Sequence, residues 1–320
     1  MNSLRDRRIL LFIAAACLAT MPDLTGADNQ TPTGVKWVNP QLPKGPGLQH
    51  RVFASAALGC EVGYVVWRPP HYEPTRKYPV IYFLHGANGT ESSDAAGFSG
   101  WVAKGIEGGL LPPTLVVFPN GGLSGYRGAV ETMIVQELIP LIDRTYPTLA
   151  QPKSRVVVGF SMGGAGAVRL AVLHPELFAA AASMGGRAGG EVDAAAEKNA
   201  SALSQGSVAF LLINGEKDHP KAFQVLVKTF TAAGVEHSVV IHPNLEHNLG
   251  LYYEQSFERL MHFLGAHLKD HSVYKKSSAE SQRMHRTTPS LSSGCMSRSL
   301  ADLSRCSNSR SPWKHLGHEV

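Results

Sequence analysis

Six residues, Gly159-Phe160-Ser161-Met162-Gly163-Gly164, set the architecture of this 320-residue chain. They follow the β-branched run Arg155–Val158, which predicts a buried strand. They precede residues 165–173, whose apolar composition predicts a helix. A serine between glycines at such a junction occupies a sharp turn, where flanking side chains do not fit and the hydroxyl is lifted clear of the sheet. The alternative is a glycine-rich turn that only lets a helix pack close to its strand.

Strand-like and helix-like segments alternate on both sides of this turn. Apolar runs predict strands, and apolar positions three to four residues apart predict helices. The alternation predicts an α/β protein with a mostly parallel central sheet and helices on both faces. The predicted strands are residues 51–57, 61–67, 79–84, 114–118, 155–158, 178–184, 208–213 and 238–241, the first two forming an edge hairpin; the predicted helices are residues 131–145 with a kink at Pro140, 165–173, 221–233 and 253–268.

Residues suited to nucleophilic catalysis follow three of these strands. Ser161, Asp218 and His247 each lie in the loop or turn after a predicted strand. In such sheets the active groups gather outside the carboxyl ends of the strands. A serine hydroxyl needs a base to take its proton, and the histidine that serves as base needs a carboxylate to orient it. We therefore predict Ser161 as nucleophile, His247 as base and Asp218 as the carboxylate, in the chain order that accompanies a nucleophile elbow.

Two nearby residues are alternatives for these roles. Glu216 lies in the same turn as Asp218, but the shorter aspartate side chain is stiffer. His242 precedes His247, but only His247 lies in the loop between the last strand and the final helix. The spacing of the two histidines matches no usual metal-ligand pattern, and the chain has no metal-ligand or phosphate-binding motif of the common kinds. We expect neither a metal nor a cofactor.

A second loop is predicted to complete the site. The strand at residues 79–84 is followed by His85-Gly86-Ala87-Asn88-Gly89. In folds with a nucleophile elbow, the loop after such a strand supplies one backbone N–H to the oxyanion, and the residue after the nucleophile supplies another. We therefore predict an oxyanion hole formed by the N–H groups of Ala87 and Met162. The alternative is an ordinary strand-to-helix loop.

Together these motifs resemble the bacterial putative esterase family, which includes feruloyl esterases, acetyl esterases and S-formylglutathione hydrolase-like enzymes. The resemblance covers residues 50–268. It rests on Phe83–Gly86, Glu137–Pro140, Gly159–Gly164, His174–Phe178, and Gly215–Asp218 followed by Glu246-His247. Members often carry a tryptophan a few residues after the catalytic histidine, where this chain has Leu251-Tyr252-Tyr253.

The resemblance implies the α/β-hydrolase fold and the hydrolysis of carboxylic esters without a cofactor, with Ser161, Asp218 and His247 as catalytic triad. Secreted members resemble plant-cell-wall feruloyl esterases, so the implied substrate is a small-molecule or polysaccharide-linked ester. The short glycine-rich stretch at residues 185–190 implies a minimal lid. The alternatives are a peptidase or an acyltransferase with the same triad, and a non-catalytic binding module of the same fold.

Both ends of the chain differ from its body. Three arginines in the first eight residues precede an apolar run that is too short to span a bilayer comfortably. We expect residues 1–27 to be a signal peptide that directs the protein to the periplasm or outside the cell, with no stable membrane insertion after cleavage; the alternative is an uncleaved anchor. Residues 28–49 are expected to be a linker, residues 50–270 the catalytic domain, and the Ser/Arg-rich residues 271–320 a disordered tail.

The distribution of charge and of cysteine bears on the binding partners and disulfides that the chain could have. Residues 28–270 contain 19 Lys and Arg against 20 Asp and Glu, whereas residues 271–320 contain 8 against 3. The net charge of +5 therefore comes mainly from the tail, and we expect no nucleic-acid partner. Cys60 is the one cysteine of the body and is expected to be a small buried apolar residue. Neither a Cys295–Cys306 disulfide nor an oligomeric state follows from the pattern.

Overall fold

The computed structural model describes residues 34–41, 43–206 and 208–268. The expected signal peptide and the expected tail lie outside the described residues, and both stay predictions. In the described part of the chain, no helix is both long and apolar enough to cross a lipid bilayer.

Eight strands form one sheet in the order β1-β2-β4-β3-β5-β6-β7-β8. β1 and β2 form an antiparallel hairpin at the edge, and the sheet is mostly parallel, as predicted. β2 is also antiparallel to β4, a pairing that was not predicted. The strands are β1 (Leu48–Ser55), β2 (Cys60–Trp67), β3 (Val80–Leu84), β4 (Leu115–Pro119), β5 (Arg155–Phe160), β6 (Ala180–Met184), β7 (Ala209–Gly215) and β8 (His237–His242).

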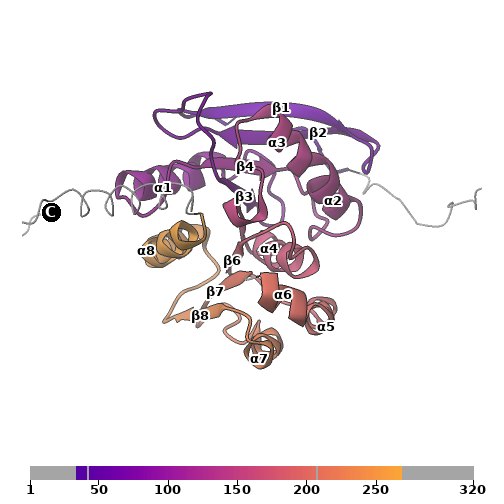
Figure 1. Ribbon diagram of the computed structural model, residues 1–320, viewed down its shortest axis with the longest axis vertical. Coiled ribbons are helices and arrows are strands. Elements are labelled where there is room, and N and C mark those ends of the chain that lie inside the picture. The colour runs from indigo at the N-terminus through magenta and orange to yellow at the C-terminus, as the bar shows by residue number, and fades with distance from the viewer. Residues whose placement is uncertain (1–33, 42, 207, 269–320) are drawn as a thin grey trace, which may run out of the picture. The chain divides into compact units, whose positions relative to one another are not determined.

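Helices cover both faces of this sheet (Figure 1). Along β3, Ile81 and Phe83 belong to one apolar core and Tyr82 and Leu84 to another, which is the two-residue alternation expected of a strand covered on both faces. One face carries α1 (Ala95–Glu107) and α8 (Leu249–His267); the other carries α2 (Ala129–Thr132), α3 (Ile139–Thr145), α4 (Met162–Leu173), α5 (Gly190–Lys198), α6 (Ala200–Gly206) and α7 (Gln224–Ala233).

Helix α1 was not anticipated from the sequence. Three glycines in this stretch weaken the helical signal, because glycine is a poor helix former. Nevertheless Ala95, Phe98 and Val102 recur at helical spacing and are buried. Packing of this apolar stripe therefore outweighs the low intrinsic propensity.

The helix predicted at residues 131–145 is divided into three parts. A π-helical segment, Met133–Leu138, separates α2 from α3. Pro140 has no N–H to donate, so a carbonyl one turn earlier loses its usual partner. The structure thus has a wider π-helical turn directly ahead of the segment that contains Pro140.

Glu137, in the middle of that segment, holds the β1–β2 turn. Its carboxylate accepts hydrogen bonds from Ser55 Oγ at 2.5 Å and from the Ala57 N–H at 2.9 Å. The Glu137–Pro140 motif therefore has a structural role away from the predicted site.

Two further boundaries differ from the predictions. α8 begins at Leu249 rather than at residue 253, because the Asn248 side chain caps it by accepting a hydrogen bond from the Leu251 N–H at 3.2 Å. β1 begins at Leu48, inside the predicted linker. The alanine-rich stretch after Gly189 forms α5 and α6.

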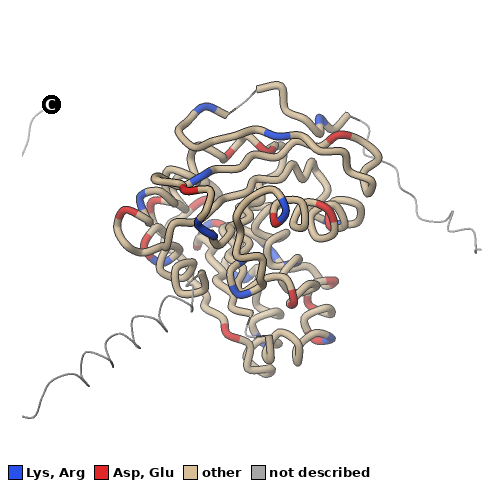
Figure 2. Tube along the Cα trace, turned by 45° about the horizontal axis from the view of Figure 1, so that its top comes forward, with Lys and Arg blue, Asp and Glu red and all other residues tan. Residues whose placement is uncertain are grey.

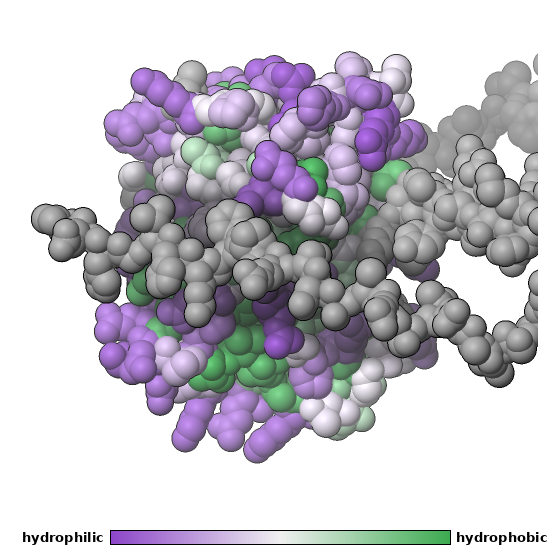
Figure 3. All heavy atoms as spheres, turned by 90° about the vertical axis from the view of Figure 1, so that its left-hand side faces the viewer, coloured by the Kyte–Doolittle hydropathy of each residue, from purple (hydrophilic) through white to green (hydrophobic). Residues whose placement is uncertain are grey.

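Charged residues of both signs are mixed over the described chain (Figure 2). The edge strand β8 exposes two apolar side chains, Val239 and Ile241, to solvent. Figure 3 shows apolar surface on the lower part of the face that carries α8. Side chains alternate between the two faces of β8, so Val239 and Ile241 are exposed while Val240 packs against the core that α8 also contacts.

The turn between β5 and α4 brings backbone segments very close together. A Cβ atom at Gly159 would overlap the carbonyl of Gly163. A Cβ atom at Gly163 would overlap the carbonyls of Leu84 and His85. Because the obstructing atoms belong to the backbone and cannot swing aside, only glycine fits at both positions. α4 therefore packs directly onto the end of β3.

Replacing Gly163 by alanine is expected to lower the free energy of unfolding by more than about 3 kcal/mol, because the added methyl group cannot be accommodated without backbone movement. The matched control is Gly97→Ala on the exposed face of α1, where nothing lies within 4 Å of an added Cβ. That change should raise the free energy of unfolding by about 0.5–1 kcal/mol. Urea denaturation measures both, and equal small effects would contradict the close packing described above.

Candidate active site

Ser161 lies on the strained turn predicted from the sequence. Its backbone has φ 57° and ψ −117°, a conformation that residues with a side chain rarely adopt. The turn is held by the Ser161 N–H, which donates to the carbonyl of Met184 at 2.8 Å. Two elements fix the position of the hydroxyl: β5, which ends at Phe160, and α4, which begins at Met162.

The structure brings Ser161, His247 and Asp218 together in one hydrogen-bonded chain. His247 Nε2 lies 2.9 Å from Ser161 Oγ, and His247 Nδ1 lies 2.7 Å from Asp218 Oδ2. A carboxylate only accepts, so Nδ1 carries the proton and Nε2 is free to accept from the serine hydroxyl. The imidazole is 45% exposed and the Asp218 side chain 2% exposed. The geometry thus joins a buried carboxylate to an accessible hydroxyl.

The two alternative residues lie elsewhere. Glu216 is exposed, and its carboxylate accepts a hydrogen bond from the Asn244 N–H at 3.1 Å. His242 Nε2 is paired with Ser256 Oγ at 2.9 Å. Within the described part of the chain, neither residue forms a hydrogen bond with Ser161 or His247.

Two aromatic residues support the imidazole and its carboxylate, and neither was assigned a role from the sequence. The Phe160 ring stacks on the His247 ring with a centroid distance of 4.7 Å. The Tyr252 hydroxyl donates to Asp218 Oδ2 at 2.6 Å. The signals in the sequence were weak: Phe160 directly precedes Ser161, and Tyr252 lies five residues after His247.

His85 orients the loop that contains Ala87. Its Nε2 accepts a hydrogen bond from the Gly121 N–H at 2.9 Å, so its Nδ1 carries the proton and donates to the Gly86 carbonyl at 2.8 Å. The Gly86 carbonyl also accepts from the Gly89 N–H at 3.1 Å. In a trans peptide the next N–H points opposite to the carbonyl, so these bonds fix the direction of the Ala87 N–H.

Met162 presents the other N–H group predicted to bind an oxyanion. It is the first residue of α4, so its N–H has no carbonyl partner within the helix. The helix dipole adds partial positive charge at this end. The Met162 N–H and the loop after His85 are the two donors predicted from the sequence, and their role in catalysis remains a proposal.

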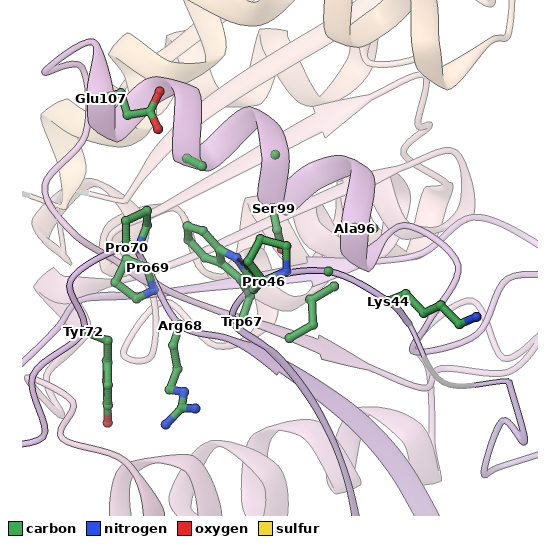
Figure 4. Close-up of a pocket in the computed structure, with 15 residues that line it drawn as sticks. Lys44, Pro46, Trp67, Arg68, Pro69, Pro70, Tyr72, Ala96, Ser99 and Glu107 are labelled. Atoms are coloured by element: carbon green, nitrogen blue, oxygen red, sulfur yellow. Dashed lines mark hydrogen bonds between the residues drawn. The ribbon is translucent and has the colours of Figure 1, made fainter.

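A separate cavity of about 670 Å³ lies between α1 and the chain around β1 and the end of β2 (Figure 4). None of the five predicted site residues lines it. Two of its polar groups already bond to each other, since the Trp67 indole N–H donates to the Pro46 carbonyl at 3.1 Å. Figure 4 shows Trp67, Pro46, Pro69 and Pro70 gathered beneath α1. The Ser161 site therefore does not open through this cavity.

In the stretches that the structure describes, no three His, Cys, Asp or Glu side chains are grouped as metal ligands would be. Cys60 is unpaired among these residues and partly buried against the core.

Comparison with known proteins places this geometry in context. Residues 55–302 match the family model described as "Putative esterase". Esterase MT1326 of Mycobacterium tuberculosis (strain CDC 1551) is 33% identical over 154 residues, which cover 45% of this chain and 33% of that protein. An endo-1,4-beta-xylanase/feruloyl esterase of Xylanibacter ruminicola is 26% identical over 196 residues, 58% of this chain and 26% of that protein. The chain thus spans a third or less of the length of these curated relatives.

Solved structures support the fold. A ferulic acid esterase superposes with a TM-score of 0.61 at 19% sequence identity, covering 69% of this chain and 98% of that one. Together with the eight-stranded, mostly parallel sheet, this similarity confirms the predicted α/β-hydrolase fold.

The buried His85 yields a pH-dependent prediction. Burial lowers the pKa of this imidazole, so the folded protein keeps it neutral while the unfolded chain takes up a proton near pH 6.5. Its contribution to stability is therefore present above that pH and is lost as the pH falls. His85→Gln should lower the free energy of unfolding by about 1–3 kcal/mol at pH 7, because a buried hydrogen bond is lost.

The deficit of the His85→Gln protein should be smaller at pH 5 than at pH 7, as measured by urea unfolding at both values. His262→Gln, on the exposed face of α8, is the control and should change the free energy of unfolding by less than about 0.5 kcal/mol at pH 7. A deficit that grows on acidification would show that His85 is charged in the folded protein.

Proposed function

The chain belongs to the putative esterase family, and we propose that it is a serine hydrolase of carboxylic esters that acts through Ser161, Asp218 and His247. One observation carries this proposal: the hydrogen-bonded chain from the buried Asp218 carboxylate through His247 to the Ser161 hydroxyl. The hydroxyl at the end of this chain lies on the strained turn. His247 carries its proton on Nδ1, which leaves Nε2 free to act as a general base.

The geometry supports a two-step reaction. Ser161 Oγ attacks the ester carbonyl carbon while His247 Nε2 takes the hydroxyl proton, and Asp218 stabilises the imidazolium that forms. The N–H groups of Ala87 and Met162 hold the developing oxyanion. His247 returns the proton to the leaving alcohol, which gives an acyl-enzyme. A water molecule, deprotonated by His247, then attacks the acyl group, and the proton returns to Ser161 as the acid departs.

We propose small-molecule or polysaccharide-linked esters with acetyl or feruloyl acyl groups as substrates. The support comes from the names of relatives, one a xylanase/feruloyl esterase and one solved structure a ferulic acid esterase. Only five residues separate Met184, the end of β6, from Gly190, the start of α5, so little chain is available there to form a lid. An open site suits an ester that is attached to a polymer.

Replacing Ser161 by alanine should lower kcat by at least about 10⁴-fold, because the nucleophile is lost while the fold is kept. The measurement is hydrolysis of p-nitrophenyl acetate, butyrate and octanoate and of methyl ferulate by residues 28–320. Unchanged turnover by the alanine variant would overturn the proposal. Cleavage of peptide anilides without ester turnover would instead indicate a peptidase. Transfer of the acyl group to an added alcohol in preference to hydrolysis would indicate an acyltransferase.

A matched pair of variants controls this experiment. Asp218→Asn should cost roughly 10³–10⁴-fold in kcat, because the amide no longer selects the productive tautomer of His247. Glu216→Gln, two residues earlier in the same turn, should change kcat by less than about 2-fold, because Glu216 is exposed and bonded to Asn244. The reverse ranking would transfer the carboxylate role to Glu216.

We further propose that residues 1–27 direct export and are removed. Three arginines followed by an apolar run, with small residues at Thr25-Gly26-Ala27, support this. Mass spectrometry of the protein recovered from the periplasm or medium of a bacterial host should find an N-terminus at Asp28. A variant with two lysines inside the run at residues 9–19 should stay in the cytoplasm. Recovery of exported protein that still begins at Met1 would contradict cleavage.

A further inference from the structure

We infer that Tyr252 is a positioning residue for the hydrolytic reaction: its phenol holds the Asp218 carboxylate in the orientation that directs His247 toward Ser161. The inference rests on the proposed function, because the positioned groups are those of the proposed triad. It adds a residue that neither the sequence motifs nor the family resemblance assigned.

Tyr252 bridges two parts of the site through one oxygen atom. Its hydroxyl donates to Asp218 Oδ2 at 2.6 Å and accepts from the Gly215 N–H at 2.9 Å. The whole side chain is inaccessible to solvent. Gly215 is the last residue of β7, so the phenol ties the carboxylate to the rigid end of a strand. No water competes for these bonds at a fully buried phenol, and hydrogen bonds to charged groups are the stronger kind.

Asp218 Oδ2 accepts two donors at once, His247 Nδ1 at 2.7 Å and the Tyr252 hydroxyl at 2.6 Å. Two donors that approach one oxygen from different elements define its position better than either alone. Without the phenol, the His247 imidazole alone would hold this oxygen atom. Tyr252 also spreads part of the carboxylate charge away from the imidazole.

The phenol remains a donor throughout the neutral pH range. Burial, together with the hydrogen bond to Asp218, raises the pKa of Tyr252 above its ordinary value. The other charged side chains of the two loops, Glu216, Lys217 and Glu246, are all exposed, whereas the Asp218 carboxylate is buried. Lys217 Nζ lies 3.7 Å from Glu246 Oε1, and the Glu216 carboxylate accepts from the Asn244 N–H.

Neighbouring groups are packed around this bridge. The Phe160 ring contacts the Tyr252 ring edge-on at a centroid distance of 5.6 Å and stacks on His247. Gly185 approaches from β6 with φ 59°, and a Cβ atom there would lie 2.9 Å from Asp218 Oδ2 and 3.2 Å from the Tyr252 hydroxyl. The carboxylate, imidazole and phenol therefore occupy a space with little room for rearrangement.

The next residue along α8 provides a matched control. Tyr253 is also buried, but its hydroxyl has no hydrogen-bond partner among the described residues. Its ring packs near Phe98 and Trp101, with centroid distances of 6.1 and 5.9 Å. Tyr252→Phe and Tyr253→Phe thus remove the same atom from adjacent positions of one helix, but only the first removes a bond to Asp218.

The experiment compares kcat, KM and the pH profile of ester hydrolysis for the two variants. In Tyr252→Phe, kcat should fall by about 10-fold with KM unchanged. The acid limb of the kcat/KM profile should move to higher pH by about 0.5–1 unit, because the carboxylate then stabilises the imidazolium more strongly. Tyr253→Phe should change neither. In an Asp218→Asn background, Tyr252→Phe should have less than about a 2-fold effect, since its role is exerted through the carboxylate.

Unchanged kcat and pH profile in Tyr252→Phe would overturn the inference, as would equal shifts in both variants. If the Tyr252→Phe variant does not fold, the inference can still be tested by a measurement on the unaltered protein. Its proton NMR spectrum should contain two slowly exchanging low-field signals, from the Tyr252 hydroxyl and from His247 Nδ1–H, with a nuclear Overhauser contact between them. Absence of that contact also overturns it. These signals need no turnover, so their presence without ester hydrolysis would refute the proposed function alone.

Discussion

Close backbone packing between α4 and the end of β3 places Ser161 and the loop that contains Ala87 in a common frame. Gly163 lies against the carbonyls of Leu84 and His85, so the start of α4 cannot move independently of the loop that follows β3. Because Ser161 and Met162 immediately precede Gly163, backbone contacts hold the turn that carries the hydroxyl and the N-terminus of α4 against the end of β3. Such a frame needs no reorganisation when charge develops on the substrate.

Two buried side chains, His85 and Tyr252, hold the loop after β3 and the Asp218 turn in the same way. His85 joins the loop after β3 to the Gly121 N–H just beyond β4. Tyr252 joins the Asp218 turn to the Gly215 N–H at the end of β7. In each case a ring is buried in the core while its polar atom contacts the backbone at the end of a neighbouring strand. The ends of the strands therefore set the positions of both the loop that contains Ala87 and the Asp218 carboxylate.

The strands could be predicted from the sequence because their apolar runs are short and continuous. The run at residues 79–84, for example, suits a strand covered on both faces better than a helix. The sequence also placed Ser161, Asp218 and His247 at strand ends, where the structure brings them together. It did not predict α1, since glycines obscured the apolar stripe, nor the role of Tyr252. The bond from Tyr252 to Asp218 joins residues 34 positions apart, and its geometry depends on the rotation of α8, which periodicity does not define.

The rotation of α8 is set by the residue that directly follows His247. Asn248 caps the helix through the Leu251 N–H, and its carbonyl accepts the first helical bond, from the Tyr252 N–H at 3.0 Å. Successive helical residues point about 100° apart, so a start one residue later would turn Tyr252 away from Asp218 and bring Tyr253 toward it. The cap thus selects which of two adjacent tyrosines reaches the carboxylate. The same asparagine thus joins the loop that carries His247 to the helix that carries Tyr252, while the buried residues of α8 hold the helix against the sheet.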